Sequence, residues 1–167
     1  MSSAAAAAKA AKAASYLKTP FIRIGGSFYR PPYVARVQTD GSFKPTMSRT
    51  SAVLFTNYDW KGALLRYDAG FHKNSTEAEW ESVCNGLKYS MYRKEMALQL
   101  ENDNLGIIQC ITMQRRPKKE RFGWYYDEVY SLSKEFEWLG LRWVPREYNV
   151  ADILFRKKFG PPNQENF

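Results

Sequence analysis

Three β-rich segments follow one another before the first helical pattern, and this order limits the folds open to the chain. The segments 33–40, 49–56 and 62–70 are rich in β-branched and aromatic residues, and Asn57-Tyr58-Asp59 predicts a turn between the second and the third. Short connections between consecutive strands favour antiparallel pairing. We therefore predict a three-stranded antiparallel meander at the start of the folded region.

Helical and strand patterns alternate after this meander. Thr76 with Glu79 three residues later is a capping-box pattern that predicts the start of a helix ending near Tyr92. The patterns that follow predict a strand, a short helix, a long helix, a strand and a last helix, over 96–100, 105–112, 124–139, 141–144 and 149–158. The fold class is α/β, with a mixed sheet of five strands and helices on its faces.

Length and composition favour one folded domain. The chain has 167 residues and is 44% hydrophobic, which is enough for a substantial core. No apolar run approaches the roughly 20 residues that cross a bilayer, so we expect no membrane insertion. Cys84, Cys110 and His72 match no metal-ligand spacing, and we interpret the cysteines as half-buried thiols in a cytoplasmic or other reducing intracellular compartment.

The net charge of +8 is concentrated near the N-terminus. Residues 1–39 hold six basic and no acidic residues, and the first 15 are rich in alanine. We interpret residues 1–32 as a basic arm and linker, 33–160 as the domain, and 161–167 as a flexible tail. The arm is a flexible tail, an anchor for a larger nucleoprotein assembly, or an organelle-targeting peptide; the last is disfavoured because no arginine precedes Arg23.

Four acidic residues fall where the sheet and its helices are expected to meet. Asp40 ends the first predicted strand before a turn at Gly41, and Asp103 follows the fourth strand. Glu79 and Asp152 lie at the beginnings of two helices. If the first and fourth strands are neighbours, Asp40 and Asp103 emerge side by side, and the helical carboxylates can lean over that edge.

Clustered carboxylates repel one another and raise each other's pKa values, so they are tolerable only around a cation. Oxygen ligands without histidine or cysteine suit Mg²⁺ or Mn²⁺. Two such ions can activate water for displacement at a phosphate. Each acid alone could equally be an ordinary helix-terminus or turn residue.

The same residues carry a resemblance to a known family. Thr39-Asp40-Gly41-Ser42, Thr76-Glu77-Ala78-Glu79-Trp80, Leu100-Glu101-Asn102-Asp103-Asn104 and the stretch 143–152 occur in the order seen in type 1 ribonuclease H domains. From about Tyr33 to Lys158 the chain resembles this family. The resemblance implies a five-stranded sheet and metal-dependent endonucleolytic cleavage of the RNA strand of an RNA–DNA hybrid, leaving a 3′-hydroxyl and a 5′-phosphate.

The resemblance also implies site residues. Its four metal-binding carboxylates correspond to Asp40, Glu79, Asp103 and Asp152; Glu79 is preferred to Glu77 because it directly precedes Trp80. Further residues are expected to bind substrate: Asn74 and Thr76 a phosphate, the backbone of Gly41 and Ser42 a ribose 2′-hydroxyl, and Arg115, Arg116, Lys118 and Lys119 the DNA strand.

The sequence departs from the family in the loop 145–148, which lacks a histidine present in many members; Arg146 or Glu147 is expected nearby instead. Two other functions therefore remain open. The fold could serve as a nucleic-acid-binding or structural module of a larger assembly, or as another nuclease such as a junction resolvase or integrase, which the motif Asn149-Val150-Ala151-Asp152 fits less well.

Overall fold

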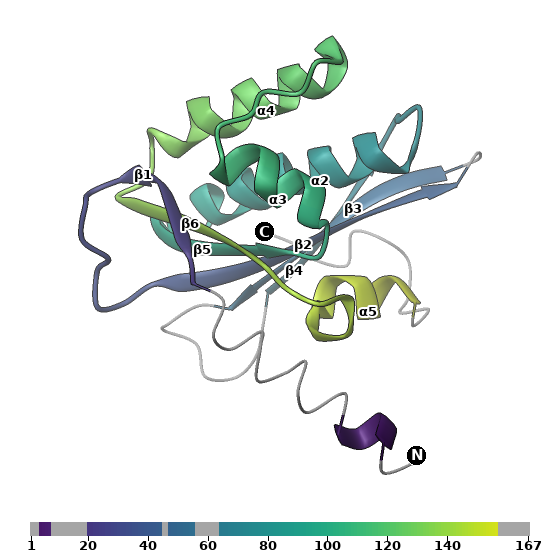
Figure 1. Ribbon diagram of the computed structural model, residues 1–167, viewed down its shortest axis with the longest axis horizontal. Coiled ribbons are helices and arrows are strands. Elements are labelled where there is room, and N and C mark those ends of the chain that lie inside the picture. The colour runs from purple at the N-terminus through teal and green to yellow at the C-terminus, as the bar shows by residue number, and fades with distance from the viewer. Residues whose placement is uncertain (1–3, 8–19, 45–46, 56–63, 157–167) are drawn as a thin grey trace.

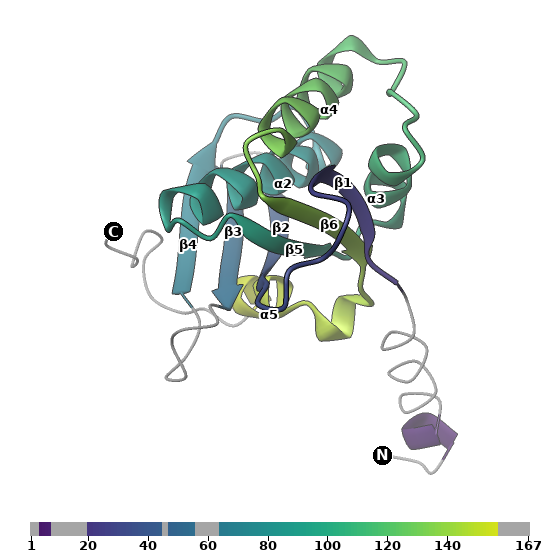
Figure 2. The same cartoon turned by 90° about the vertical axis from the view of Figure 1, so that its left-hand side faces the viewer.

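The computed structural model describes residues 4–7, 20–44, 47–55 and 64–156 of the chain. A six-stranded sheet in the order β1-β6-β5-β2-β3-β4 forms its centre. Helices α2, α3 and α4 lie on one face of the sheet, and α5 lies on the other (Figures 1 and 2). The predicted mixed α/β architecture is confirmed, with six strands where we expected five.

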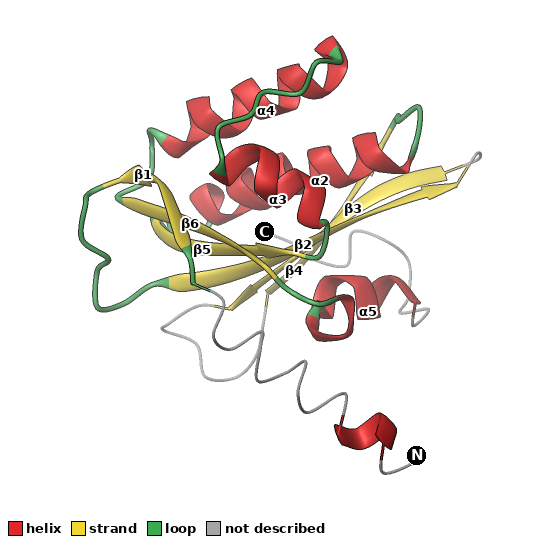
Figure 3. Cartoon of the chain, viewed as in Figure 1, coloured by secondary structure: helices red, strands yellow, loops and turns green. Residues whose placement is uncertain are grey.

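The elements follow the predicted alternation (Figure 3). In chain order they are β1 (Ile22–Gly26), β2 (Ala35–Lys44), β3 (Met47–Phe55), β4 (Leu64–Gly70), α2 (Ser75–Tyr92), β5 (Ala97–Asn102), α3 (Leu105–Thr112), α4 (Glu120–Ser133), β6 (Trp138–Trp143), the 3-10 turn η1 (Arg146–Tyr148) and α5 (Val150–Arg156). The predicted turn at 57–59 and the tail 161–167 lie outside the described residues.

Strands β2, β3 and β4 form the predicted antiparallel meander. The prediction that β2 ends at Asp40 is wrong, because pairing with β3 continues from Arg36↔Phe55 to Lys44↔Met47. Gly41 stays in the strand, opposite Thr50, instead of turning the chain. Asp40 thus projects from the middle of β2, where it pairs with Ser51 of β3 and directly follows Thr39, the last residue paired with β5.

Strands β5 and β6 extend the sheet beyond β2 in parallel. Thr39 pairs with Asn102, and Asn102 with Trp143, so β5 and β6 end side by side at the level of Thr39 in β2. Between the sheet and helices α2 to α4 lies the core, formed by fully buried aliphatic residues that include Val37, Leu54, Val83, Leu87, Leu98, Leu100, Ile111, Val129, Leu139 and Leu141.

Strand β1 was missed by the sequence analysis, which interpreted residues 1–32 as a basic arm and linker. Ile22 pairs with Leu141 and Gly26 with Trp138, with a bulge between Arg23 and Gly25. A Cβ atom at position 25 would lie 2.6 Å from the carbonyl oxygen of Ser133, and Gly26 has a φ of +82°. The two glycines therefore allow an edge strand to pass close beneath the end of α4, rather than marking a linker.

Two helix boundaries also differ from the prediction. The N-cap of α2 is Asn74, whose side chain accepts a hydrogen bond from the Glu77 backbone at 2.9 Å, and not Thr76. Helix α4 begins at Glu120 and ends at Ser133, so Leu139 belongs to β6 and not to a helix. None of the described helices is long and apolar enough to cross a membrane.

Candidate metal centre

Strand pairing and one close helix contact bring the acidic residues together. Since Thr39 pairs with Asn102, the next residues along β2 and β5 are Asp40 and Asp103. Helix α2 passes directly over β2 at Gly41, where an added Cβ would lie 2.6 Å from the backbone nitrogen of Glu79. The absence of a side chain at Gly41 therefore lets Glu79 reach Asp40.

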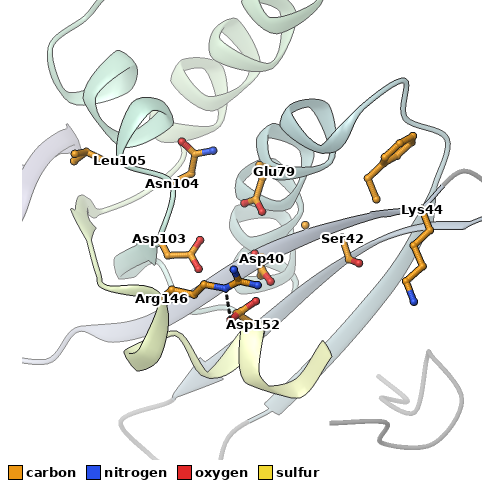
Figure 4. Close-up of a pocket in the computed structure, with 11 residues that line it drawn as sticks. Asp40, Ser42, Lys44, Glu79, Asp103, Asn104, Leu105, Arg146 and Asp152 are labelled. Atoms are coloured by element: carbon orange, nitrogen blue, oxygen red, sulfur yellow. Dashed lines mark hydrogen bonds and ion pairs between the residues drawn. The ribbon is translucent and has the colours of Figure 1, made fainter. Parts of the chain in front are cut away.

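One carboxylate oxygen from each of Asp40, Glu79 and Asp103 can be chosen so that all three lie within 4.8 Å of one another. Asp152, in the first turn of α5, lies outside this triad but lines the same pocket of about 840 Å³. Figure 4 shows the four carboxylates around one space. The structure thus places all four predicted acids in one pocket and three of them at the distances of a shared ion.

Burial and like charge perturb this cluster. Burial raises the pKa of Asp40 to about 10, and the adjacent carboxylate of Glu79 adds to the effect. Burial also raises the pKa of Glu79 to about 7, together with the charge of Asp103 and against hydrogen bonds that involve Asp40 and Gly41. Burial and the charge of Asp152 raise the pKa of Asp103. Asp40, Glu79 and Asp103 therefore resist ionisation, first because they are buried and second because neighbouring carboxylates carry the same charge.

These residues fit a divalent cation. The Oε2 atom of Glu79 is buried and has no hydrogen-bond partner among the described residues. Buried carboxylate oxygens without a partner are unfavourable, and a cation at this position would satisfy them. Since the donors are all carboxylate oxygens, the site suits hard ions such as Mg²⁺ or Mn²⁺.

Arg146 is the basic residue nearest the centre. It takes part in the turn η1 and donates a hydrogen bond from Nε to Oδ2 of Asp152 at 3.0 Å. Its side chain is 66% exposed, so little packing holds it in place. Arg146, rather than Glu147, lines the pocket from the loop 145–148. His72 lies elsewhere, between Ser48 and Glu81.

Buried amides that the sequence analysis missed hold the site together. The Gln38 side chain donates to the carbonyl oxygen of Tyr148 at 3.1 Å and accepts from the backbone of Val150 at 2.8 Å. Asn102 and Asn149 both donate to the carbonyl oxygen of Thr39. These bonds tie β5 and the start of α5 to β2, next to Asp40. Such roles depend on contacts between distant residues, which no local pattern reveals.

The predicted substrate-binding residues are dispersed. Gly41 and Ser42 line the pocket, together with Lys44, which the sequence analysis did not single out. Asn74 uses its side-chain oxygen as the cap of α2, and Thr76 is exposed nearby. Arg115, Lys118 and Lys119 are exposed between α3 and α4, outside the pocket lining, and Arg116 is paired with Asp127.

Comparisons with known proteins agree with this architecture. The family model described as reverse transcriptase-like matches residues 38–157, which is more than half of the chain. No curated protein sequence matches the chain. The match to the family model runs from within β2 to the end of α5 and includes all four carboxylates, while β1 precedes it.

Several solved structures share the fold. The ribonuclease H1 of Halobacterium salinarum has a TM-score of 0.64 and 15% identity, over 70% of this chain and 89% of that one. The N-terminal ribonuclease H domain of rv2228c from Mycobacterium tuberculosis has a TM-score of 0.65 and 20% identity, over 73% and 90%. LC11-RNase H1, solved in complex with an RNA/DNA hybrid, has a TM-score of 0.61 and 17% identity, over 72% and 92%. The chain is thus a member of the reverse transcriptase-like family, with the fold of type 1 ribonucleases H.

Proposed function

We propose that this protein is a metal-dependent endonuclease that cleaves the RNA strand of RNA–DNA hybrids. The observation that carries the proposal is the convergence of Asp40, Glu79 and Asp103 within 4.8 Å, with Asp152 in the same pocket. Family membership supports the same reaction class. A related structure, LC11-RNase H1, binds an RNA/DNA hybrid.

The four carboxylates would hold two divalent ions, Mg²⁺ or Mn²⁺. Bound there, such ions would activate a water molecule and stabilise the leaving oxygen of a phosphodiester. Asp40 is suited to a rigid ligand because it lies in the middle of β2 and is only 4% exposed. A cation would compete with Arg146 for the Asp152 carboxylate, and the exposed arginine could then contact the substrate phosphates.

Substrate discrimination is assigned to the pocket rim. The backbone of Gly41 and Ser42 lines the pocket and can contact a ribose 2′-hydroxyl, which distinguishes RNA from DNA. Asn74 and Thr76 would contact a phosphate, and the exposed Arg115, Arg116, Lys118 and Lys119 the DNA strand. The products would carry a 3′-hydroxyl and a 5′-phosphate.

Cleavage of a labelled RNA–DNA hybrid in Mg²⁺ tests the proposal. The wild-type protein and Asp68→Asn, which changes a carboxylate outside the pocket, should cut the RNA strand. The Asp103→Asn variant should cleave the RNA strand at least about 100-fold more slowly, because it lacks one of the negatively charged metal ligands. Duplex DNA and four-way junctions in parallel reactions test the alternative of another nuclease with this fold.

A second candidate function is a nucleic-acid-binding or structural module of a larger assembly. The ion pair between Arg146 and Asp152 favours it, since one of the four carboxylates is already neutralised by the protein itself. In that case the wild-type protein and Asp103→Asn would both leave the hybrid intact. Assembly through the N-terminal arm remains a prediction, and residues 8–19 lie outside the described chain.

A further inference from the structure

A second pocket lies away from the carboxylates and has the opposite electrostatic character. It has a volume of about 460 Å³ and is lined by Phe21, Arg23, Phe28, Arg30, Gln99 and Trp138. This aromatic pocket, as we call it, combines two arginines and three aromatic rings with no acidic residue. The metal centre, by contrast, is lined by four carboxylates.

The pocket is built on the sheet face opposite α2 to α4. Side chains alternate along a strand, and Leu139 and Leu141 of β6 point into the core. Trp138 and Gly140 therefore face the other way, as does Gln99, which pairs with Gly140. On this face α5 packs against β2 and β3, and β1, β5 and β6 have no helix over them among the described residues.

Arginine and aromatic side chains form layers in the pocket. A Cβ atom on Gly140 would meet the Trp138 ring at 2.5 Å, so this ring lies across the glycine. The Arg30 guanidinium lies 5.9 Å from the centre of the Trp138 ring, and Arg23 lies 5.9 Å from that of Phe28. Arg23 donates a hydrogen bond to the carbonyl oxygen of Gly26 at 3.0 Å, and the Arg30 guanidinium lies against the side-chain amide of Gln99. Neither arginine pairs with a carboxylate among the described residues, so no anionic group there neutralises the two positive charges.

The rim of the pocket exposes further rings. Phe28 is 78% exposed and Tyr29 81%, and the two rings meet edge to face with centroids 5.3 Å apart. Tyr33, a few residues further on, is 73% exposed. Exposed aromatic residues gathered beside arginines that have no carboxylate partner are unusual on a free surface, and they match a ligand with flat rings and negative charge.

We propose that the aromatic pocket binds an unpaired nucleotide of a single-stranded nucleic acid, such as a flank of the hybrid substrate. Its phosphate would lie against Arg23 and Arg30, and its base would stack on Phe28. Proteins that bind single strands combine positive grooves with stacking rings in this way. Along β5, Gln99 and Asp103 are four residues apart, or about 13 Å, so a short flank spans the interval.

Fluorescence anisotropy in EDTA tests the proposal without engaging the metal centre. The probes are single-stranded RNA and DNA of about ten nucleotides, a length that single-strand-binding folds occupy. Phe28→Ala should weaken binding at least about fivefold through loss of stacking. Arg30→Gln should weaken binding and reduce the slope of log K against log salt by about 0.7, whereas Phe28→Ala should leave this slope unchanged.

A matched pair of variants serves as the control. Phe71→Ala removes a ring that is 99% exposed and follows β4, and Arg49→Gln removes one positive charge from β3. Strands β3 and β4 lie at the end of the sheet opposite β1. The two control variants should change affinity by less than about twofold. Equal losses in both pairs, or unchanged binding in the pocket variants, would overturn the proposal. So would self-association of the wild type that Phe28→Ala abolishes while oligonucleotide binding persists.

Further controls separate this proposal from the nuclease activity. Asp103→Asn should bind the single strands like the wild type, and the pocket variants should cleave a blunt, fully paired hybrid at a rate within about twofold of wild type. Arg30→Lys, which keeps the charge and removes the planar group, should preserve the salt slope even if Arg30→Gln folds poorly. If the pocket variants lose affinity for only one of the two probes, RNA or DNA, this result supports the proposal and identifies the strand that supplies the flank.

Discussion

At the residue scale, the clustered carboxylates oppose the stability of the protein that holds them. Asp40 is 4% exposed, and the Oε2 atom of Glu79 is buried without a partner among the described residues. Burial of these carboxylates costs free energy, and a bound cation would offset that cost. The pH dependence of stability is therefore a direct measure of the site.

In EDTA, the free energy of unfolding should fall as the pH rises from 5 to 9, about the range that the raised pKa values bracket. Burial raises the pKa of Asp40, so the folded state binds this proton more tightly than the unfolded state does. That stabilisation is complete below the pKa of the unfolded chain and is lost as pH rises toward the pKa of the folded state. Urea denaturation across this range measures the slope.

Asp40→Asn should flatten this dependence and stabilise the metal-free protein by about 1–3 kcal/mol at pH 8, while abolishing cleavage. Mg²⁺ should raise the melting temperature of the wild type but not that of the variant. Asp68→Asn is the control, and a slope unchanged by Asp40→Asn would contradict the interpretation.

Gly41 tests the contact between α2 and β2. Gly41→Ala should destabilise the protein by about 1–3 kcal/mol and slow cleavage, because its Cβ would lie 2.6 Å from the Glu79 nitrogen and displace that carboxylate. Gly106→Ala is a matched control, since its Cβ would meet its nearest neighbour at 3.4 Å. Thermal unfolding and hybrid cleavage of both variants provide the measurement; equal effects would contradict the prediction.

At the scale of elements, the position of α5 depends on side chains from β2. Helix α5 is short, with seven residues, and carries Asp152. Gln38 bonds the carbonyl oxygen before it and the first amide within it. Gln38 also donates a hydrogen bond to Glu101, which is 0% exposed and paired with Arg142. A buried polar network of this kind fixes geometry more than it adds stability.

Gln38→Ala should therefore release α5 from the sheet. We expect a loss of about 1–3 kcal/mol, since the Val150 amide and the Glu101 carboxylate lose a partner. Amide hydrogen exchange should accelerate in α5 more than in α2, and cleavage should slow through displacement of Asp152. The exposed Gln109→Ala is the control, and uniform acceleration in all helices would argue against a local role.

At the scale of the whole molecule, β1 pairs with β6 and replaces it as the edge strand; because β1 is short and bulged, it is a poorer template for association than β6 would be. Unpaired edges are templates for association with other chains. Removal of residues 1–26 should lower the melting temperature and increase aggregation, as measured by light scattering. Removal of residues 1–19 leaves every described strand in place and should do neither; equal behaviour of the two truncations would show that β1 does not protect the edge of β6.

The sequence by itself determined the order of elements from β2 to α5, since hydrophobic periodicity is local and survives without tertiary contacts. It also singled out the four acids, because each of them belongs to a short motif of adjacent residues. The ends of the elements were predicted less well. Asp40-Gly41 is locally a turn pattern, but pairing with β3 and close packing against α2 keep this stretch extended.

Only the tertiary structure decided which distant residues meet. It placed Gly25 and Gly26 in an edge strand, because α4 and β6 pass too close for any side chain there. It paired Arg146 with Asp152 and used Gln38 to hold α5. Such contacts join residues far apart in the chain and form only once the sheet has brought them together. They therefore cannot be predicted from a local pattern of residues.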